Sequence, residues 1–186
     1  MSSEITVQDN FLDKELFEYI RNTMLSGFDG SGTFPWYMNN GTVVVSDENI
    51  IPLWESENLN NDAIFSWTHV FFHNHYSNSQ YYDKIILPLL DKINPVAVAR
   101  VKGNLYPCTD EIIEHGYHVD YEDSNSNAKT SIFYLNTNNG YTKLLDGTVI
   151  ESIANRLLTF PTNMPHTSST CNDKQITSNI NINYYK

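Results

Sequence analysis

Hydrophobic side chains recur at helical spacing in two segments of the chain, 13–25 and 79–93. In the first segment, Asp13 is a suitable N-cap and Gly27 a suitable terminator. In the second, Ser79 is the predicted cap, and the pattern ends at Asn94-Pro95 because proline disfavours helical conformation in the residue before it. We therefore predict two amphipathic helices. Their apolar faces contain Leu12, Leu16, Phe17, Ile20 and Met24 in the first helix, and Tyr82, Ile85, Ile86, Leu89, Leu90 and Ile93 in the second.

After Pro95 the pattern changes to short segments of strand-type composition separated by turn residues. Asn139-Gly140 and Asp146-Gly147 are typical of hairpin turns. Several short strands at this spacing favour an antiparallel sandwich or barrel. The predicted strands are 96–106, 115–121, 129–136, 141–145, 148–152, 156–160 and 179–185, preceded by a short one at 42–46. We expect a mainly β fold with flanking helices, an α+β arrangement around a jelly-roll core.

The length of 186 residues suits one domain, and no repeat or linker divides the chain. We therefore predict a single domain over 1–186. Residues 1–95 would form flanking helices and strands, and residues 96–186 the jelly-roll core. The segment 52–78 has no pattern that assigns it to either element type.

The net charge of the chain limits the classes of partner that it is expected to bind. Acidic side chains number 22 and basic ones 11, a net charge of −11, which repels a phosphate backbone and disfavours nucleic acid as a partner. No apolar run approaches the roughly 20 residues that span a bilayer, and the first residues lack a secretory pattern. We expect a cytoplasmic protein with no membrane partner. Cys108 and Cys171 form no CxxC motif, so we interpret both as reduced packing residues.

Candidate chemistry begins with His118 and Asp120. They lie two residues apart in a segment that alternates as a strand, so their side chains would share one face. His166 follows a later apolar strand. Two histidines and one carboxylate on adjoining strands would make a facial triad, which favours Fe(II) and leaves the opposite face of the metal open. His-x-Asp pairs also occur in surface and capping roles, and spacing alone leaves both interpretations open.

Other histidines give weaker signals. His69, His73 and His75 lie close together, but no carboxylate follows at ligand spacing. Ordinary packing or the lining of a substrate cleft is therefore favoured over a second metal site. His115 is a candidate for the mouth of a cavity, with a surface imidazole as the alternative.

The chain from about Val98 to its end resembles the Fe(II)- and 2-oxoglutarate-dependent oxygenase superfamily, specifically its small prolyl-4-hydroxylase-like members found in phages. The resemblance is carried by the segments 104–121, 130–152, 154–173 and 179–185. It implies a double-stranded β-helix, or jelly-roll, core that binds Fe(II) through His118, Asp120 and His166. The cosubstrate would be 2-oxoglutarate, with ascorbate as an optional further cofactor.

The activity that the resemblance implies couples O₂ and the oxidative decarboxylation of 2-oxoglutarate to hydroxylation of a substrate C–H bond. Peptidyl proline is the substrate that the resemblance suggests, so a peptide, protein or small molecule is the expected partner. A phage-encoded protein would act in the cytoplasm of its host. Two alternatives remain: a non-catalytic metal-binding module that has lost its 2-oxoglutarate site, and an oxygenase that acts on a small metabolite or nucleobase.

The cosubstrate site departs from the pattern of the superfamily. Members of this type carry an arginine after the distal histidine that binds the far carboxylate of 2-oxoglutarate, and Thr177 stands in its place here. Lys129 and Lys174 are the predicted replacements, ahead of Arg156, with ordinary solvated lysines as the alternative. A hydroxyl contact from Thr177 or Tyr134 is also expected. Tyr106, Tyr117 and Tyr134 lie on strands that line the cavity in the superfamily, although each also suits a hydrophobic core.

Overall fold

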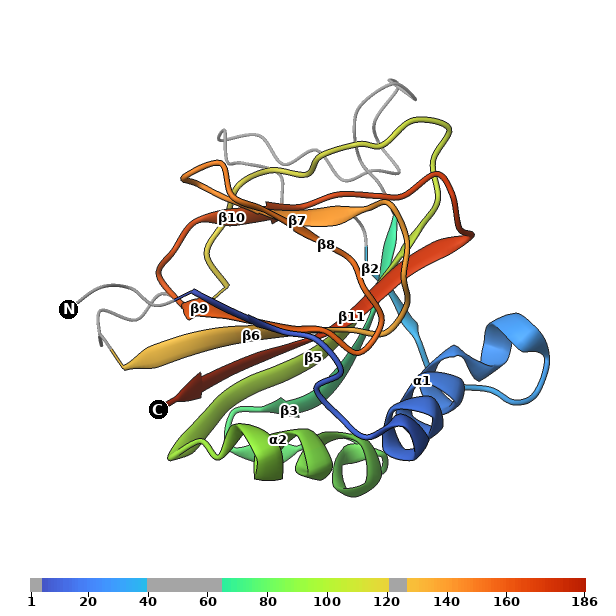
Figure 1. The fold of residues 1–186 in the computed structure, drawn as a ribbon. Helices are drawn as coiled ribbons and strands as arrows, with labels where there is room; N and C mark the ends of the chain where they lie inside the picture. The colour runs from blue at the N-terminus through green and yellow to red at the C-terminus, as the bar shows by residue number, and fades with distance from the viewer. Residues whose placement is uncertain (1–4, 40–64, 121–126) are drawn as a thin grey trace.

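The computed structural model describes residues 5–39, 65–120 and 127–186, which form two antiparallel sheets and flanking helices. The larger sheet has eight strands, in the order β1-β9-β6-β11-β5-β3-β2 with β4 paired to β3. The smaller has three, in the order β10-β7-β8. The two sheets face each other, and α1 and α2 lie against the far side of the larger one (Figure 1). This is the jelly-roll architecture that the sequence predicts.

The strands have the following bounds. The N-terminal ones are β1 (Thr6–Gln8), β2 (Tyr37–Asn39), β3 (Ser66–His73) and β4 (Tyr76–Ser77). The core strands are β5 (Ala97–Pro107), β6 (Ala128–Tyr134), β7 (Tyr141–Leu144), β8 (Val149–Glu151), β9 (Leu157–Pro161), β10 (His166–Ser168) and β11 (Ile176–Tyr185). The larger sheet thus extends beyond 96–186, because β1 joins one edge and β2 to β4 extend the other.

The first predicted helix is α1 (Lys14–Asp29), which begins as expected. The Asp13 carboxylate accepts a hydrogen bond from the Leu16 backbone N–H, which satisfies one of the free donors of the first turn. The predicted end at Gly27 is wrong. The helix continues to Asp29 and is followed by Gly30, whose φ of 76° is the left-handed conformation that terminates a helix and favours glycine.

The second predicted helix begins later than expected. A π-helical turn, η2 (Tyr82–Ile86), leads into α2 (Leu87–Ile93), which ends at Asn94 in the left-handed conformation. Ser79 caps no helix, although its hydroxyl accepts a hydrogen bond from the Tyr81 N–H. No helix among the described residues combines the length and apolar character needed to cross a membrane.

Strand β11 lies at the centre of the larger sheet, between β5 and β6. Its sequence alternates isoleucine with asparagine, so the two kinds of side chain project from opposite faces. Ile180 and Ile182 pack with side chains of both helices in the main hydrophobic cluster. Asn181 and Asn183 point between the two sheets. A second, smaller cluster, which includes Tyr134, Leu144 and Phe160, fills part of that inner space.

Most of the predicted strands after Pro95 are confirmed, but the structure differs from the prediction in several places. Segment 115–121 forms no continuous strand among its described residues. It is joined to β10 by an isolated bridge at His118 and by the His115 N–H, which donates to the Ser168 carbonyl oxygen at 2.8 Å. Strands β1, β2 and β10 are not among the predicted strands. Strand β3 falls within the unassigned segment 52–78, and the predicted strand 42–46 lies outside the described residues. The Asp146-Gly147 turn is confirmed, with Gly147 at a φ of 89°, and both cysteines are free thiols.

The histidine-rich segment divides between core and surface. The His69 ring is 4% exposed, with Nδ1 2.7 Å from the Pro35 carbonyl oxygen and Nε2 2.7 Å from the Ser79 hydroxyl. These bonds fit a neutral imidazole that donates from Nδ1 and accepts at Nε2. His73 and His75 lie at the exposed β3–β4 hairpin. His69 is thus a packing residue, as the sequence interpretation favours.

The central position of β11 predicts a large stability cost for changes on its helix-facing side. Ile182 is fully buried, so Ile182→Ala should lower the free energy of unfolding by about 2–5 kcal/mol. Leu145→Ala, at a position that is 62% exposed, is the matched control and should change it by less than about 0.5 kcal/mol. Urea unfolding of both variants measures the difference. Equal costs would contradict the placement of β11.

Burial of His69 predicts a pH-dependent stability. Burial lowers the pKa of this imidazole below its ordinary value of 6.5, although the hydrogen bond to Pro35 opposes the shift. Below about pH 6.5 the imidazole therefore binds a proton more readily in the unfolded chain than in the folded one. The contribution of His69 to the free energy of unfolding is present above that pH and is lost as the pH falls. In His69→Gln, the decrease in melting temperature from pH 7.5 to pH 5 should be smaller than in the wild type. An unchanged decrease would exclude His69 as its source.

Candidate metal centre and cavity

His118 and His166 lie opposite each other on paired backbone segments. The His118 N–H donates to the His166 carbonyl oxygen at 2.9 Å, and the His166 N–H returns the bond at 3.0 Å. This reciprocal pairing places both side chains on the same face, with ring centroids 4.6 Å apart. The backbone therefore brings the two imidazoles together before any metal is considered.

Backbone carbonyl groups fix the orientation of both rings. Nδ1 of His118 is 3.1 Å from the Gly116 carbonyl oxygen, and Nδ1 of His166 is 3.2 Å from that of Met164. A carbonyl oxygen only accepts, so each Nδ1 carries the proton and each Nε2 keeps a free lone pair. Metal-binding histidines are typically held in this way.

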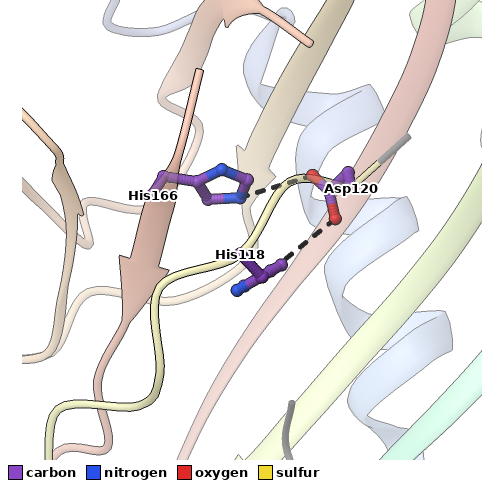
Figure 2. A group of neighbouring side chains, drawn as sticks. All are labelled: His118, Asp120 and His166. Atoms are coloured by element: carbon purple, nitrogen blue, oxygen red, sulfur yellow. Dashed lines mark ion pairs between the residues drawn. The ribbon is translucent and has the colours of Figure 1, made fainter. Parts of the chain in front are cut away.

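Asp120 completes the group (Figure 2). Its Oδ1 is 3.8 Å from His118 Nε2, and its Oδ2 is 3.3 Å from His166 Nε2. Within the described residues this is the only group of three candidate ligands, with ligand atoms all within 4.8 Å of one another. Neighbouring ligand atoms on one face of an octahedral ion, each bonded at about 2.1 Å, lie about 3 Å apart. The donor set and its spacing therefore fit a divalent transition metal.

Two further side chains hold the Asp120 carboxylate. Asn181 Nδ2 donates to Oδ2 at 2.7 Å, and Arg100 Nη2 donates to Oδ1 at 3.3 Å. Burial alone would raise the pKa of Asp120, whose side chain is 7% exposed. The interactions with His166, Asn181 and Arg100 outweigh burial and hold that pKa well below its ordinary value. Asp120 is therefore held in the ionised form that a metal ligand requires.

A cavity of about 150 Å³ opens beside these three residues, between the larger sheet and the segment that bears His118. Its lining is mostly polar, and β5 and the segment 115–120 contribute most to it. The described residues that line it are Asn39, Ser66, Thr68, Arg100, Lys102, Asn104, Tyr106, His115, His118, Val119, Asp120, Ile132, His166, Ser168, Asn179 and Asn181.

Several groups in this lining lack partners or have shifted pKa values. Oδ1 of Asn104, Oδ1 of Asn181 and Nε2 of His115 are buried without a hydrogen bond among the described residues. Burial lowers the pKa of His115 to about 4, with a further contribution from His118. Burial and the neighbouring Arg100 also lower the pKa of the Lys102 ammonium, while Asp120 opposes that shift. Unsatisfied buried polar atoms are rare in native proteins, so this lining has polar capacity for a ligand.

The predicted cosubstrate residues divide into two groups. Tyr106 lines the cavity, and burial raises the pKa of its hydroxyl to about 12. Thr177 and Tyr134 do not line it. The Thr177 hydroxyl accepts a hydrogen bond from Asn138 Nδ2 at 3.1 Å, and the Tyr134 hydroxyl donates to Thr142 Oγ1 at 2.7 Å. Tyr117 is also absent from the lining.

None of the predicted replacement cations lies in the cavity. Lys129 shares its strand face with Phe133, which packs against the helices, and it lines a separate pocket with Lys92 and Lys186. Lys174 is exposed on the loop before β11. The Arg156 guanidinium pairs with Asp9 at 2.6 Å, outside the cavity.

Arg100, Lys102, Asn104 and Asn181 are site residues that the sequence interpretation missed. The available signal was alternation: β5 and β11 carry a polar side chain at every second position, and the polar sets of both strands face the same space. Lys102 is the register partner of Asn181 in the β5–β11 ladder. Their proximity depends on that register, which the local pattern does not specify.

Comparisons with known proteins place the fold. No protein-family model matches the chain, and no curated protein matches it in sequence. Among solved structures, an oxidoreductase of the 2OG-Fe(II) oxygenase family from Burkholderia pseudomallei has a TM-score of 0.61 and 12% identity, covering 97% of this chain and 84% of that one. A prolyl-4-hydroxylase from Pseudomonas putida has a TM-score of 0.54 and 12% identity, with coverage of 100% and 94%.

A third similar structure is a prolyl hydroxylase from Trichoplax adhaerens, solved with a peptide fragment of the hypoxia inducible factor oxygen degradation domain. Its TM-score is 0.58 and its identity 14%, with coverage of 99% of this chain and 84% of that one. At such identities the likeness establishes the fold. The chain has the jelly-roll fold of the 2OG-Fe(II) oxygenases.

The ligand geometry predicts which histidine is needed for metal. Changes to residues that only support metal ligands cost about 10- to 100-fold in affinity, so loss of a ligand in His118→Ala should weaken Fe(II) binding by more than about 100-fold. His73→Ala, on the exposed hairpin, is the matched control and should bind one equivalent. Anaerobic dialysis followed by elemental analysis measures both. If the two variants retain the same iron, the assignment of ligands is incorrect.

Proposed function

We propose that the protein is an Fe(II)- and 2-oxoglutarate-dependent dioxygenase that hydroxylates a substrate C–H bond. The observation that carries this proposal is the convergence of two imidazole Nε2 atoms and one carboxylate at a polar cavity inside the jelly roll. The fold shared with 2OG-Fe(II) oxygenases supports it, as do the sequence motifs that resemble the phage-type members. Such an arrangement occupies one face of a metal and leaves the other face for exchangeable ligands.

The roles of the residues follow from their contacts. His118, Asp120 and His166 would hold Fe(II), which when bound supplies a site for 2-oxoglutarate and O₂ and the redox chemistry of hydroxylation. The Gly116 and Met164 carbonyl groups keep both imidazoles in the tautomer that binds metal. Asn181 and Arg100 fix the Asp120 carboxylate, which limits its rotation when a ligand exchanges on the metal.

The substrate we propose is a peptidyl proline. Two of the similar structures are prolyl hydroxylases, and one was solved with a peptide fragment. In this chain Asn39, Ser66 and Thr68, from β2 and β3 at one edge of the larger sheet, contribute to the cavity lining. Tyr37 and Met38, next to Asn39, are each 64% exposed and offer apolar contact area for a peptide at this edge.

A second candidate function is a metal-binding module without catalysis. It is favoured by one observation, the uncharged Thr177 where an arginine would bind 2-oxoglutarate. The Thr177 hydroxyl accepts a hydrogen bond from Asn138 and does not line the cavity, so this position offers the cosubstrate no charge. The two candidates differ in whether 2-oxoglutarate binds at the metal.

An anaerobic titration separates the two candidates. We expect the Fe(II)-loaded protein to develop the visible charge-transfer band of a 2-oxoglutarate chelate, and to release succinate when O₂ is admitted. Asp120→Ala, which removes a ligand, should give neither signal. A wild-type protein that binds iron but develops no band would support the metal-binding module, and mass spectrometry for a gain of one oxygen in proline-containing peptides tests the substrate.

A further inference from the structure

We propose that Lys102 on β5 binds the distal carboxylate of the 2-oxo acid cosubstrate, in place of the arginine that Thr177 replaces. The inference rests on the proposed function and names the residue that would give this site its preference for a dicarboxylate. It follows from the positions of the cations in and around the cavity.

A dicarboxylate held at the metal through its 2-oxo acid end carries a second negative charge into the cavity. An unpaired buried carboxylate is costly, so a cation or several hydrogen-bond donors must meet it. Thr177 cannot supply this charge. Its side chain is 5% exposed, bonded to Asn138 and absent from the cavity lining.

Two cations line the cavity among the described residues, Arg100 and Lys102. Arg100 is already committed, since Nη2 donates to Asp120 Oδ1 at 3.3 Å and Nε donates to Asn183 Oδ1 at 3.0 Å. Moving Arg100 onto a cosubstrate would release a carboxylate that serves as a metal ligand. Arg100 is therefore a positioning residue for Asp120.

Lys102, in contrast, is available to bind a ligand. Its ammonium makes no hydrogen bond or ion pair with any residue in the described part of the chain. Asn181, its register partner on β11, donates to Asp120, so Lys102 projects from the sheet beside the metal centre. The unpartnered Oδ1 atoms of Asn104 and Asn181 lie in the same lining and can accept the remaining ammonium protons. If two of its protons are donated to these oxygens, the ammonium keeps the third for an anion.

A matched pair of 2-oxo acids tests the assignment. 2-Oxoglutarate and 2-oxopentanoate have the same chain length and the same chelating end, and only the first has a distal carboxylate. Anaerobic titration of the Fe(II)-loaded protein, followed by the charge-transfer band, measures both dissociation constants. We expect the wild type to bind 2-oxoglutarate at least about tenfold more tightly, a difference of about 1.4 kcal/mol.

Lys102→Met should abolish this preference by weakening 2-oxoglutarate about tenfold or more, while 2-oxopentanoate binds as before. Lys102→Arg, which keeps the charge, should preserve the preference. Lys129→Met and Lys174→Met are the controls and should match the wild type, because neither residue lines the cavity. Mn(II) binding by each variant checks that the metal centre is folded, and Lys102→Gln replaces Lys102→Met if the latter fails this check.

The outcomes separate this inference from the proposed function. A Lys102→Met or Lys102→Gln protein that keeps the wild-type preference would overturn the role of Lys102 and leave the oxygenase proposal standing. The same holds if Lys129→Met or Lys174→Met loses the preference instead. A wild type that binds iron but neither 2-oxo acid would overturn both.

Discussion

The period-two alternation of β11 is the constraint on which the rest of the molecule depends. The strand is paired on both sides, so each side chain must point either to the helices or into the space between the sheets. Its isoleucines join the core beneath α1 and α2, and its asparagines form a polar row inside the jelly roll. A shift of one residue would place amides in the apolar core and isoleucines beside the candidate metal centre. One strand thus fixes both the packing and the polarity of the cavity.

The candidate metal centre depends on a second constraint, the reciprocal backbone pairing of His118 with His166. The sequence predicts these ligands from spacing and resemblance, and the structure brings them together although 115–121 is not a continuous strand. A single antiparallel bridge is enough, because it sets the direction of both side chains. The predicted strand over 115–121 is therefore wrong, and yet His118, Asp120 and His166 lie close together as expected.

The cations of the site show where local patterns stop being informative. Lys129 lies at the start of β6, which follows the predicted ligands His118 and Asp120 in the sequence. It is four residues from Phe133 on the same strand, so both side chains face the helix side of the sheet. Lys102 carries no motif and precedes the ligands by a whole loop. It reaches the cavity only because β5 pairs with β11 in the register that sets Lys102 opposite Asn181. Register over such a separation is decided by the packing of the complete sheet, which no local sequence pattern records.

The polar interior has a cost in stability that helps to explain its composition. An unpartnered buried polar atom costs about 1–3 kcal/mol, and Asn104 and Asn181 each leave one in the cavity. Apolar residues at these positions would pack between the sheets, as Ile132 and Phe160 do in the neighbouring cluster. They would also remove the donor that holds Asp120 and the acceptors beside Lys102. A native protein that keeps an unfavourable polar row, where its fold allows a favourable apolar one, does so at a site that needs those groups for a ligand. In this molecule that row begins at Asp120 in the candidate metal centre and continues along β5 and β11, so the three candidate ligands and the polar cavity form one site.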